Sequence, residues 1–478
     1  MDFLKSNILK IKQKKSGFDI VIVVSSNNNS KYWEWRLSKT KKFILPSKTK
    51  IICVEENWKN KEGAGQLLGT LNAILEANKK INIKKALFAN KKIAIYHTAG
   101  KGKRMAPLTG KEKNNKPAIK LPMPIKIESK NNLISLLEAV IFSTQIFSKS
   151  RKGRICVFWG DQIIIPSRKP QIETNFPVEI FATKKEFFLT KEEWEKNWKM
   201  YGILIPQKEG VLQREKLSFE KIKELKKKKI LPLRKNKVIL FKSFGCFSIS
   251  APLLFALIEE FSKELKERKE KLDIDPDLWT PLTSPKKDFE NKSYWERINK
   301  FKKAFEEKEK TPLIIEGKDL GEKTIFFDFG NLQSYYENLI KITEKSSQAK
   351  LVRNLFGIEK YFKNGSLIIN SKINGKIKNS VVLNSKIKKA DIKKAVIINS
   401  EIKEIIGKNI LLYYIKEKNT LKPLPNEVIT DIKIKEGEII RMKTNISRDG
   451  KEDWKIKLPQ NPFSYEELEK LISRIEIK

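Results

Sequence analysis

Short apolar runs recur along the first third of the chain, and stretches with apolar residues at helical spacing lie between them. Continuous apolar runs of this length are typical of buried strands, whereas spacing of three and four residues is typical of helices packed on a sheet. The predicted strands are Phe18–Val24, Lys50–Val54, Ile93–Tyr96 and Arg154–Trp159; the predicted helices contain Tyr32 to Arg36, extend through Leu75, and cover Leu133–Phe147. This alternation predicts a three-layer, Rossmann-like α/β domain with a mostly parallel sheet, whose ligands bind at the carboxyl ends of the strands.

A different pattern begins after residue 360, where three similar segments follow one another. They are Ser366–Ile373, Ser380–Ile387 and Ala395–Ile402, which begin 14 and then 15 residues apart. Short β-rich repeats of this kind stack into solenoids, because each coil buries its apolar residues against the next. The pattern therefore predicts an α/β domain over residues 1–345, a β-solenoid over 346–412, and further strands with a capping helix over 413–478.

The composition fits a folded chain of several domains. With 478 residues, of which 40% are hydrophobic, the chain has room for two or three domains with substantial cores. No apolar run reaches the roughly 18 residues that span a membrane, and residues 1–13 lack the apolar core of a signal peptide. The cysteines Cys53, Cys156 and Cys246 are far apart in the sequence and lie in apolar strands. We therefore expect buried free thiols and a reducing, cytoplasmic environment.

The formal net charge of +42 raises the alternative of a nucleic-acid-binding protein, because a basic surface attracts phosphate backbones. The lysines, however, are spread along the whole chain and mixed with glutamates, as in 259–271 and 302–310. Such stretches are typical of solvated helix faces. The charge alone therefore argues weakly for nucleic acid.

The strongest candidate for chemistry is the loop that follows the third predicted strand. Gly100 and Gly102 let the backbone approach a phosphate chain, because no Cβ blocks it. Lys101, Lys103, Arg104 and Lys116 bring positive charge to the same loop, with Arg104 as a fork of donors and Lys116 as a point charge. Two common phosphate loops are excluded, since neither the P-loop pattern nor the third glycine of a dinucleotide fingerprint is present. These residues predict a site for a nucleoside triphosphate.

The segment Ala99-Gly100-Lys101-Gly102-Lys103-Arg104-Met105, with Lys116-Pro117 downstream, resembles the signature loop of the sugar-1-phosphate nucleotidyltransferases. That resemblance implies transfer of a nucleotidyl group from a nucleoside triphosphate to a sugar 1-phosphate, with Mg²⁺ as cofactor. The segment Leu68-Gly69-Thr70-Leu71 precedes the loop, an order similar to the fucose-1-phosphate guanylyltransferases. The loop itself is closer to the uridylyltransferase pattern, so the guanylyl and uridylyl types both stay open.

The resemblance also implies roles for individual residues. Asp161, after a strand, and Asp328, in Phe326-Phe327-Asp328-Phe329-Gly330, match the family's two metal-binding aspartates, and Asp161 joins Arg104 and Lys116 as catalytic. The implied nucleotide-binding residues are Ala99, Gly100, Lys101, Gly102, Lys103, Gln66, Gly69 and Thr70, and the implied sugar-binding residues are Tyr201, Gly202 and Gly245. Phe219-Glu220-Lys221 matches the family's Glu-Lys-Pro segment only loosely, and chance explains it better. We expect no acid–base role for His97.

The repeats resemble the left-handed β-helix tail found on many of these enzymes, although coils of 14 and 15 residues are shorter than the family's usual coil. We expect this tail to be structural, and a homo-oligomer joined through it is a further expectation. The alternatives are a non-catalytic sensor of nucleotides or sugar nucleotides that kept the loop, and a basic nucleic-acid-binding protein. A sensor could lose Asp161 or Asp328 without consequence, which separates it from an enzyme.

Overall fold

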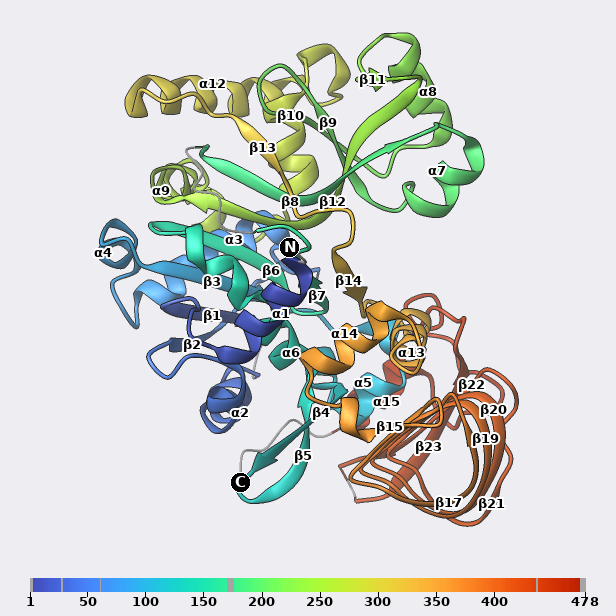
Figure 1. Ribbon diagram of the computed structural model, residues 1–478. Coiled ribbons are helices and arrows are strands. Elements are labelled where there is room, and N and C mark those ends of the chain that lie inside the picture. Colours follow the sequence, from blue (N-terminus) through green and yellow to red (C-terminus); the bar gives the residue numbers. More distant parts are fainter. Residues whose placement is uncertain (1–2, 27–28, 61, 170–175, 436, 473–478) are drawn as a thin grey trace.

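The computed structural model describes residues 3–26, 29–60, 62–169, 176–435 and 437–472. The strands predicted in the first third of the chain lie side by side in a parallel arrangement (Figure 1). Their order across the sheet is β2 (Lys50–Glu55), β1 (Ile20–Ser25), β3 (Lys92–His97) and β6 (Arg154–Trp159). The carboxyl ends of these strands therefore meet at one edge, as expected for an α/β fold.

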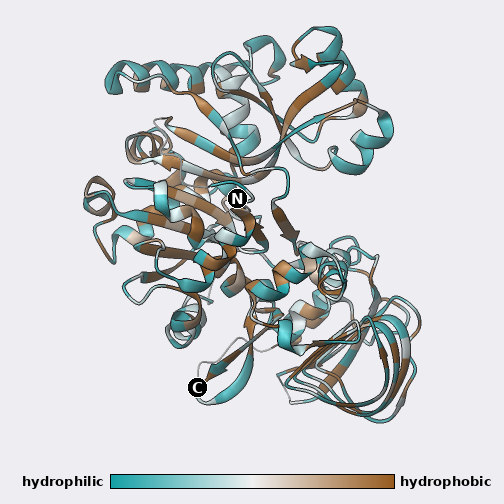
Figure 2. Ribbon diagram, viewed as in Figure 1, coloured by the Kyte–Doolittle hydropathy of each residue, from teal (hydrophilic) through white to brown (hydrophobic). Residues whose placement is uncertain are grey.

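Apolar residues of the parallel strands pack alternately on the two faces of the sheet. Val21 and Val23 belong to one buried cluster, and Ile20, Ile22 and Val24 belong to another. Helices α2 (Ser30–Ile44) and α6 (Leu136–Thr144) cover the first face, and α3 (Gly65–Asn78), α4 (Ile83–Phe88) and α9 (Ala251–Glu260) cover the second. Figure 2 shows the apolar strands enclosed between helices whose outer sides are polar. The three-layer, Rossmann-like α/β arrangement is thus present.

Antiparallel strands extend the sheet beyond β6. The long strand β12 (Lys237–Ser250) pairs with β6, β8 (Val178–Phe187) and β9 (Gly202–Pro206). Strand β10 (Val211–Glu215) pairs with β9, and β13 (Ile315–Asp319) runs parallel to β8. On this lobe, Trp194 of α7 (Lys191–Asn197) and Trp198 just after it are buried in one cluster with Ile222 of α8 (Phe219–Lys227) and with residues of β9 and β12. The lobe delivers Tyr201, Gly202 and Gly245 to the edge at which the parallel strands end.

The helix predicted over Leu133–Phe147 is wrong at its start. Residues Lys130–Ser135 form strand β5, which pairs with β4 (Lys120–Ile127), and α6 begins only at Leu136. Ser135 and Glu138 form a capping box that fixes this start, and a 3-10 turn over Gln145–Ser150 replaces the last turn. The carboxylate of Glu138 also accepts hydrogen bonds from Arg36 at 2.8 and 2.9 Å, an ion pair buried between α2 and α6.

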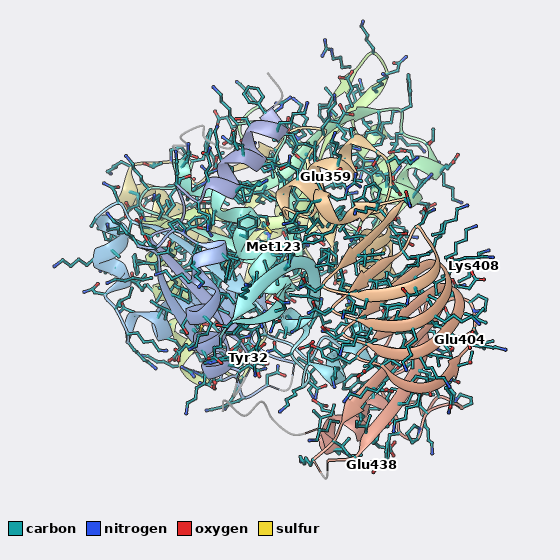
Figure 3. All side chains as sticks on the ribbon, turned by 60° about the horizontal axis from the view of Figure 1, so that its bottom comes forward. Tyr32, Met123, Glu359, Glu404, Lys408 and Glu438 are labelled. Carbon is teal, nitrogen blue, oxygen red and sulfur yellow. The ribbon has the colours of Figure 1, made fainter. Side chains whose placement is uncertain are left out.

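The repeated segments form a stack of parallel strands. Leu367 pairs with Val381, Val381 with Val396, and Val396 with Leu411, so each repeat lies beside the next. The strands involved include β16 (Ser366–Ile369), β17 (Lys372–Lys378), β18 (Val381–Leu383), β19 (Lys386–Ile398), β20 (Glu401–Tyr413), β21 (Lys416–Leu421) and β22 (Glu427–Lys433). Glu404 and Lys408 lie on the outer side of this stack (Figure 3). An antiparallel strand, β23 (Ile439–Asn445), ends it.

Short elements join the stack to the α/β domain. Helices α5 (Leu108–Lys111) and α15 (Tyr465–Leu471) lie between the two in Figure 1. Other elements of the α/β domain are α1 (Phe3–Gln13), α12 (Lys292–Glu309), α13 (Leu332–Lys341), β7 (Gln162–Ile165) and β14 (Ile325–Asp328), and α14 (Ser347–Leu355) precedes the stack. Among the described residues, no helix combines the length and the apolar character needed to span a membrane.

Candidate active site

The glycine loop leaves the end of β3 in the backbone conformation that its sequence predicts. Gly100 and Gly102 have φ angles of 114° and 61°, a backbone conformation that residues other than glycine rarely adopt. A Cβ on Gly102 would lie 2.5 Å from the Cβ of Lys116, whereas a Cβ on Gly100 would meet nothing within 4 Å. Gly102 is therefore required for Lys116 to pack against the loop, and Gly100 leaves open space beside it.

Lys116 connects this loop to the end of the neighbouring strand β6. Its Nζ donates to Asp161 Oδ2 at 2.5 Å and to the carbonyl oxygen of Gly330 at 3.4 Å. The two side chains are 13% and 25% exposed, so the ion pair is reachable from solvent. Asp161 follows Gly160, whose backbone lies so close to the end of β3 that an added Cβ would be 3.0 Å from the His97 carbonyl oxygen. Strands β3 and β6 thus bring together residues that lie 45 positions apart.

Asp328 lies beside Lys116 and Asp161, although it belongs to a segment near the end of the α/β domain in the sequence. Strand β14 pairs with β7 so that Asp328 lies opposite Gln162, and the amide of Phe329 donates to the Asp161 carbonyl oxygen at 2.9 Å. The Gly330 amide donates to Asp328 Oδ1 at 2.7 Å. Burial raises the pKa of Asp328, the charge of Asp161 raises it further, and Lys116 and Arg104 oppose both effects. The aspartates predicted from separate segments are therefore electrostatic neighbours.

Arg104 lies at the mouth of this cluster. It is exposed, and a Cβ on Gly330 would lie 3.6 Å from one of its terminal guanidinium nitrogens. The guanidinium is therefore beside the Asp328-to-Gly330 turn and faces solvent. A cation in this position is suited to an incoming phosphate group, because its donors are not buried in the core.

The segment with Gln66, Gly69 and Thr70 forms the first turns of α3, next to the glycine loop. Thr70 is 1% exposed; its hydroxyl donates to the Gln66 carbonyl at 2.7 Å and lies 2.9 Å from His97 Nε2. Burial lowers the pKa of His97 to about 4, so the ring is neutral at physiological pH. His97 therefore packs and hydrogen-bonds beside the loop. A Cβ on Gly69 would make an ordinary contact of 3.5 Å with the imidazole ring and a tighter one of 3.2 Å with Glu56 Oε1.

A cavity of about 180 Å³ lies beside Asp328 and collects residues that the sequence predicts separately. Its lining residues include Gln66, Tyr201, Gly202, Gly245 and Asp328. A Cβ on Gly245 would lie 2.8 Å from the indole nitrogen of Trp159, which also lines the cavity. One predicted nucleotide-binding residue, one predicted metal ligand and the three predicted sugar-binding residues thus line one pocket, whereas the glycine loop, Lys116 and Asp161 do not line it. Thr70, by contrast, turns its side chain inward.

Two carboxylates in this pocket were missed from the sequence. Glu215, at the end of β10, lies beside Gly202, where a Cβ would clash with it, and Asp275 faces the same cavity. Gln213 Nε2 donates to both Glu215 Oε1 and Asp275 Oδ1 at 3.3 Å. Burial raises the pKa of both groups, and the charge of Glu215 adds to the effect on Asp275.

The sequence contains a signal for one of these groups. Glu215-Lys216 is a Glu-Lys pair directly after a strand, whereas Glu220 is exposed in the first turn of α8, away from the pocket lining. The Glu-Lys pair at the strand end, and not the later Phe219-Glu220-Lys221 segment, is therefore the local signal for Glu215. No sequence pattern marks Asp275, which enters the pocket from the π-helical turn Asp275–Trp279.

Comparison with known proteins gives little direct information. No protein-family model matches the chain, and no curated protein matches it. A similar solved structure is that of HddC from Yersinia pseudotuberculosis complexed with GMP-PN, which is 13% identical; the match covers 71% of this chain and 84% of that one, with a TM-score of 0.28. Interpretation of the site therefore depends on the residues and distances described above.

Proposed function

We propose that this protein transfers a nucleotidyl group from a nucleoside triphosphate to a sugar 1-phosphate, releasing pyrophosphate. The observation that carries the proposal is the convergence of Lys116, Asp161 and Asp328 at the glycine loop, beside a pocket with hydrogen-bonding walls. A phosphate-binding loop alone would serve a sensor equally well. Paired carboxylates with a lysine at the same point are what a reaction between two anions requires.

The chemistry needs positioning and charge neutralisation more than a protein nucleophile. A phosphate oxygen of the sugar 1-phosphate attacks the α-phosphorus in line, the new P–O bond forms, and the bond to the β-phosphate oxygen breaks as pyrophosphate leaves. Lys116 and Arg104 supply positive charge where the reacting phosphates would meet. The glycine loop offers its backbone at Gly100, where nothing lies within 4 Å of a Cβ position.

Asp161 and Asp328 fit a bound Mg²⁺. Burial raises the pKa of Asp328 and the charge of Asp161 raises it further, so a divalent cation would stabilise the ionised pair. Mg²⁺ commonly takes one or two carboxylates together with water and substrate phosphates, and it would supply neutralisation of the phosphate charge. Within the described residues no cluster of three or more His, Cys, Asp or Glu side chains offers a full protein-only metal site.

The pocket beside Asp328 fits the sugar. Glu215 and Asp275 are hydrogen-bond acceptors when ionised, and sugar hydroxyls are donors. Tyr201 forms part of the wall, and the glycines Gly202 and Gly245 keep the wall open. We propose no particular sugar or base, so guanylyl and uridylyl transfer both remain within the proposal. The parallel stack belongs to it as a structural tail of the left-handed β-helix type, with self-association through it as an accompanying hypothesis.

Pyrophosphate release in the presence of Mg²⁺, measured for each nucleoside triphosphate against fucose, glucose, mannose and N-acetylglucosamine 1-phosphates, tests the proposal. In the productive pair, Arg104→Ala and Asp161→Asn should each reduce turnover by at least about 100-fold, or about 3 kcal/mol. Arg234→Ala, on an exposed hairpin, is the matched control and should leave turnover unchanged. Wild-type turnover in both site variants would refute the mechanism. Nucleotide binding without turnover across the grid would favour the sensor, and oligonucleotide binding at low salt would favour the nucleic-acid alternative.

A further inference from the structure

The segment that carries Lys116 is fixed at both of its ends. Lys120 Nζ donates to Glu112 Oε2 at 3.1 Å and to the carbonyl oxygen of Ala118 at 2.6 Å. The side chains of Lys120 and Glu112 are only 7% and 10% exposed. Lys116 lies between them, on the short 3-10 turn Lys116–Ala118. The direction in which Lys116 leaves the backbone therefore depends on the geometry of this buried ion pair.

A tyrosine from the C-terminal stack completes the ion pair. The hydroxyl of Tyr413, at the end of β20, donates to Glu112 Oε1 at 2.6 Å and accepts from the Lys120 amide at 3.2 Å. Tyr413 is fully buried. Tyr335, from α13, donates to the Lys120 carbonyl oxygen at 2.7 Å. Because buried polar groups left without partners are costly, the position of the Tyr413 hydroxyl determines where Glu112 and Lys120 settle.

The C-terminal region also contacts the back of the glycine loop. A Cβ on Gly110 would lie 2.7 Å from Ile432, and one on Gly450 would lie 2.3 Å from the Lys103 carbonyl oxygen, so these backbones touch their neighbours closely. Lys101 Nζ is 2.9 Å from Glu469 Oε2, and Lys103 Nζ lies 5.0 Å from the centre of the Trp454 ring. Lys101, Lys103 and Gly110 thus contact residues that follow the repeats.

We propose that Tyr413, acting through Glu112 and Lys120, is a positioning residue that sets the location of Lys116 at Asp161. The stack then contributes to turnover from outside the α/β domain. This inference rests on the proposed function, because it assigns Tyr413 to the same site. The physical reason is that charge stabilisation at a reacting phosphate depends steeply on where the cation sits, so a small displacement of Lys116 lowers the rate.

The test compares two tyrosine hydroxyls that both join α/β-domain residues to the stack. Tyr413→Phe removes the contact with Glu112, whereas Tyr336→Phe removes a hydrogen bond of 2.7 Å to the Lys394 carbonyl oxygen and leaves the hydrogen bonds of Glu112 and Lys120 in place. We expect Tyr413→Phe to lower kcat by about 10-fold with an unchanged KM for the sugar 1-phosphate, and Tyr336→Phe to leave kcat within about two-fold. Equal effects of the two variants on kcat would overturn the proposal.

A second background separates positioning from general stability. We expect Lys116→Met to have a reduced kcat, and in that background Tyr413→Phe should cause no further loss, because the residue through which it acts is absent. Losses that multiply would show that Tyr413 acts independently of Lys116. Glu112→Gln serves as the second variant if Tyr413→Phe folds poorly, and it should show the same dependence on Lys116.

The outcomes also distinguish this inference from the proposed function. Full turnover by Lys116→Met would refute the catalytic role of Lys116 itself, whereas a damaged Lys116→Met with an unaffected Tyr413→Phe would refute only the positioning. Calorimetric titration with Mg²⁺ and a nucleoside triphosphate is the readout if no sugar 1-phosphate reacts. Tyr413→Phe should then weaken triphosphate binding several-fold in the wild-type background, and an unchanged affinity would overturn the inference.

Discussion

The paired carboxylates of the pocket give a prediction whose size follows from the geometry. Gln213 Nε2 lies 3.3 Å from Glu215 Oε1 and 3.3 Å from Asp275 Oδ1, so these two oxygens are at most about 6.6 Å apart. Two unit charges at that separation repel by roughly 2.5 kcal/mol at an effective dielectric constant of about 20, and by roughly 0.6 kcal/mol in water. Both side chains are partly exposed, so the repulsion lies between these limits.

The sign of the pH dependence follows from the raised pKa of Asp275. The folded chain holds this proton more tightly than the unfolded chain, whose carboxyl has a pKa of about 3.9. As the pH rises from that value through the higher folded pKa, the free energy of unfolding therefore falls. Asp275→Asn removes this loss while keeping an oxygen that can accept from Gln213. We expect the variant to be more stable than wild type by about 1–2 kcal/mol at pH 8, and nearly equal to it at pH 4.

Urea unfolding followed by tryptophan fluorescence at both pH values measures the difference. Asp391→Asn, at an exposed position of β19, is the matched control and should change neither curve appreciably. A destabilisation by Asp275→Asn that is the same at pH 4 and pH 8 would refute the repulsion and would mean that Asp275 has a structural role. The same variant should raise the KM for the sugar 1-phosphate if Asp275 accepts from a sugar hydroxyl.

Three further predictions concern single positions. Gly102→Ala should raise the KM for the nucleoside triphosphate by at least about 10-fold, because the added Cβ would overlap Lys116. Gly357→Ala is the control: Gly357 also has a positive φ, but an added Cβ would meet nothing within 4 Å, so that KM should not change. His97 is the only histidine of the sequence, so its ring proton resonances can be followed by NMR. They should not titrate between pH 5 and 8, because burial lowers the pKa of His97 to about 4. A titration midpoint near pH 6.5 would contradict this. Glu138→Ala should lower the free energy of unfolding by about 3–5 kcal/mol, since it leaves Arg36 buried without its partner, and a loss below about 1 kcal/mol on chemical unfolding would show that the pair is not needed.

Much of the architecture was predictable because hydrophobic patterns report burial directly. Strands β1, β2, β3 and β6 all appear where apolar runs predict them, since each is buried on both faces. The 14- and 15-residue spacing of the repeats likewise predicted which residues pair. The start of α6 was not predictable from the apolar pattern, because Leu133 and Ile134 continue the helical spacing while belonging to a strand. The capping box of Ser135 and Glu138 was the available local signal.

The site was predictable where chemistry and spacing coincide in one segment, as in the glycine loop. Asp161 and Asp328 could be predicted as strand-end aspartates, but Asp161 meets Lys116 through the pairing of β3 with β6, and Asp328 joins them through the pairing of β14 with β7. No local pattern encodes these long-range contacts. The same holds for Asp275, which the amide of Gln213 connects to Glu215, 60 positions away in the chain. Sequence patterns thus pointed to the glycine loop and the two aspartates but not to Glu215 or Asp275, whereas tertiary pairing determines which of these groups lie together.

The contact between the glycine loop and the C-terminal region changes how the tail should be understood. A tail that only mediated association could be removed without loss to the α/β domain. Here Ala106 belongs to the same buried cluster as Met442, Trp454 and Leu468, so removal of the tail would expose the back of the loop to water. Removal would also leave the Glu112 and Lys120 ion pair without the Tyr413 hydroxyl. The loop therefore contacts the strand ends of the α/β domain on one side and a buried cluster of the C-terminal region on the other.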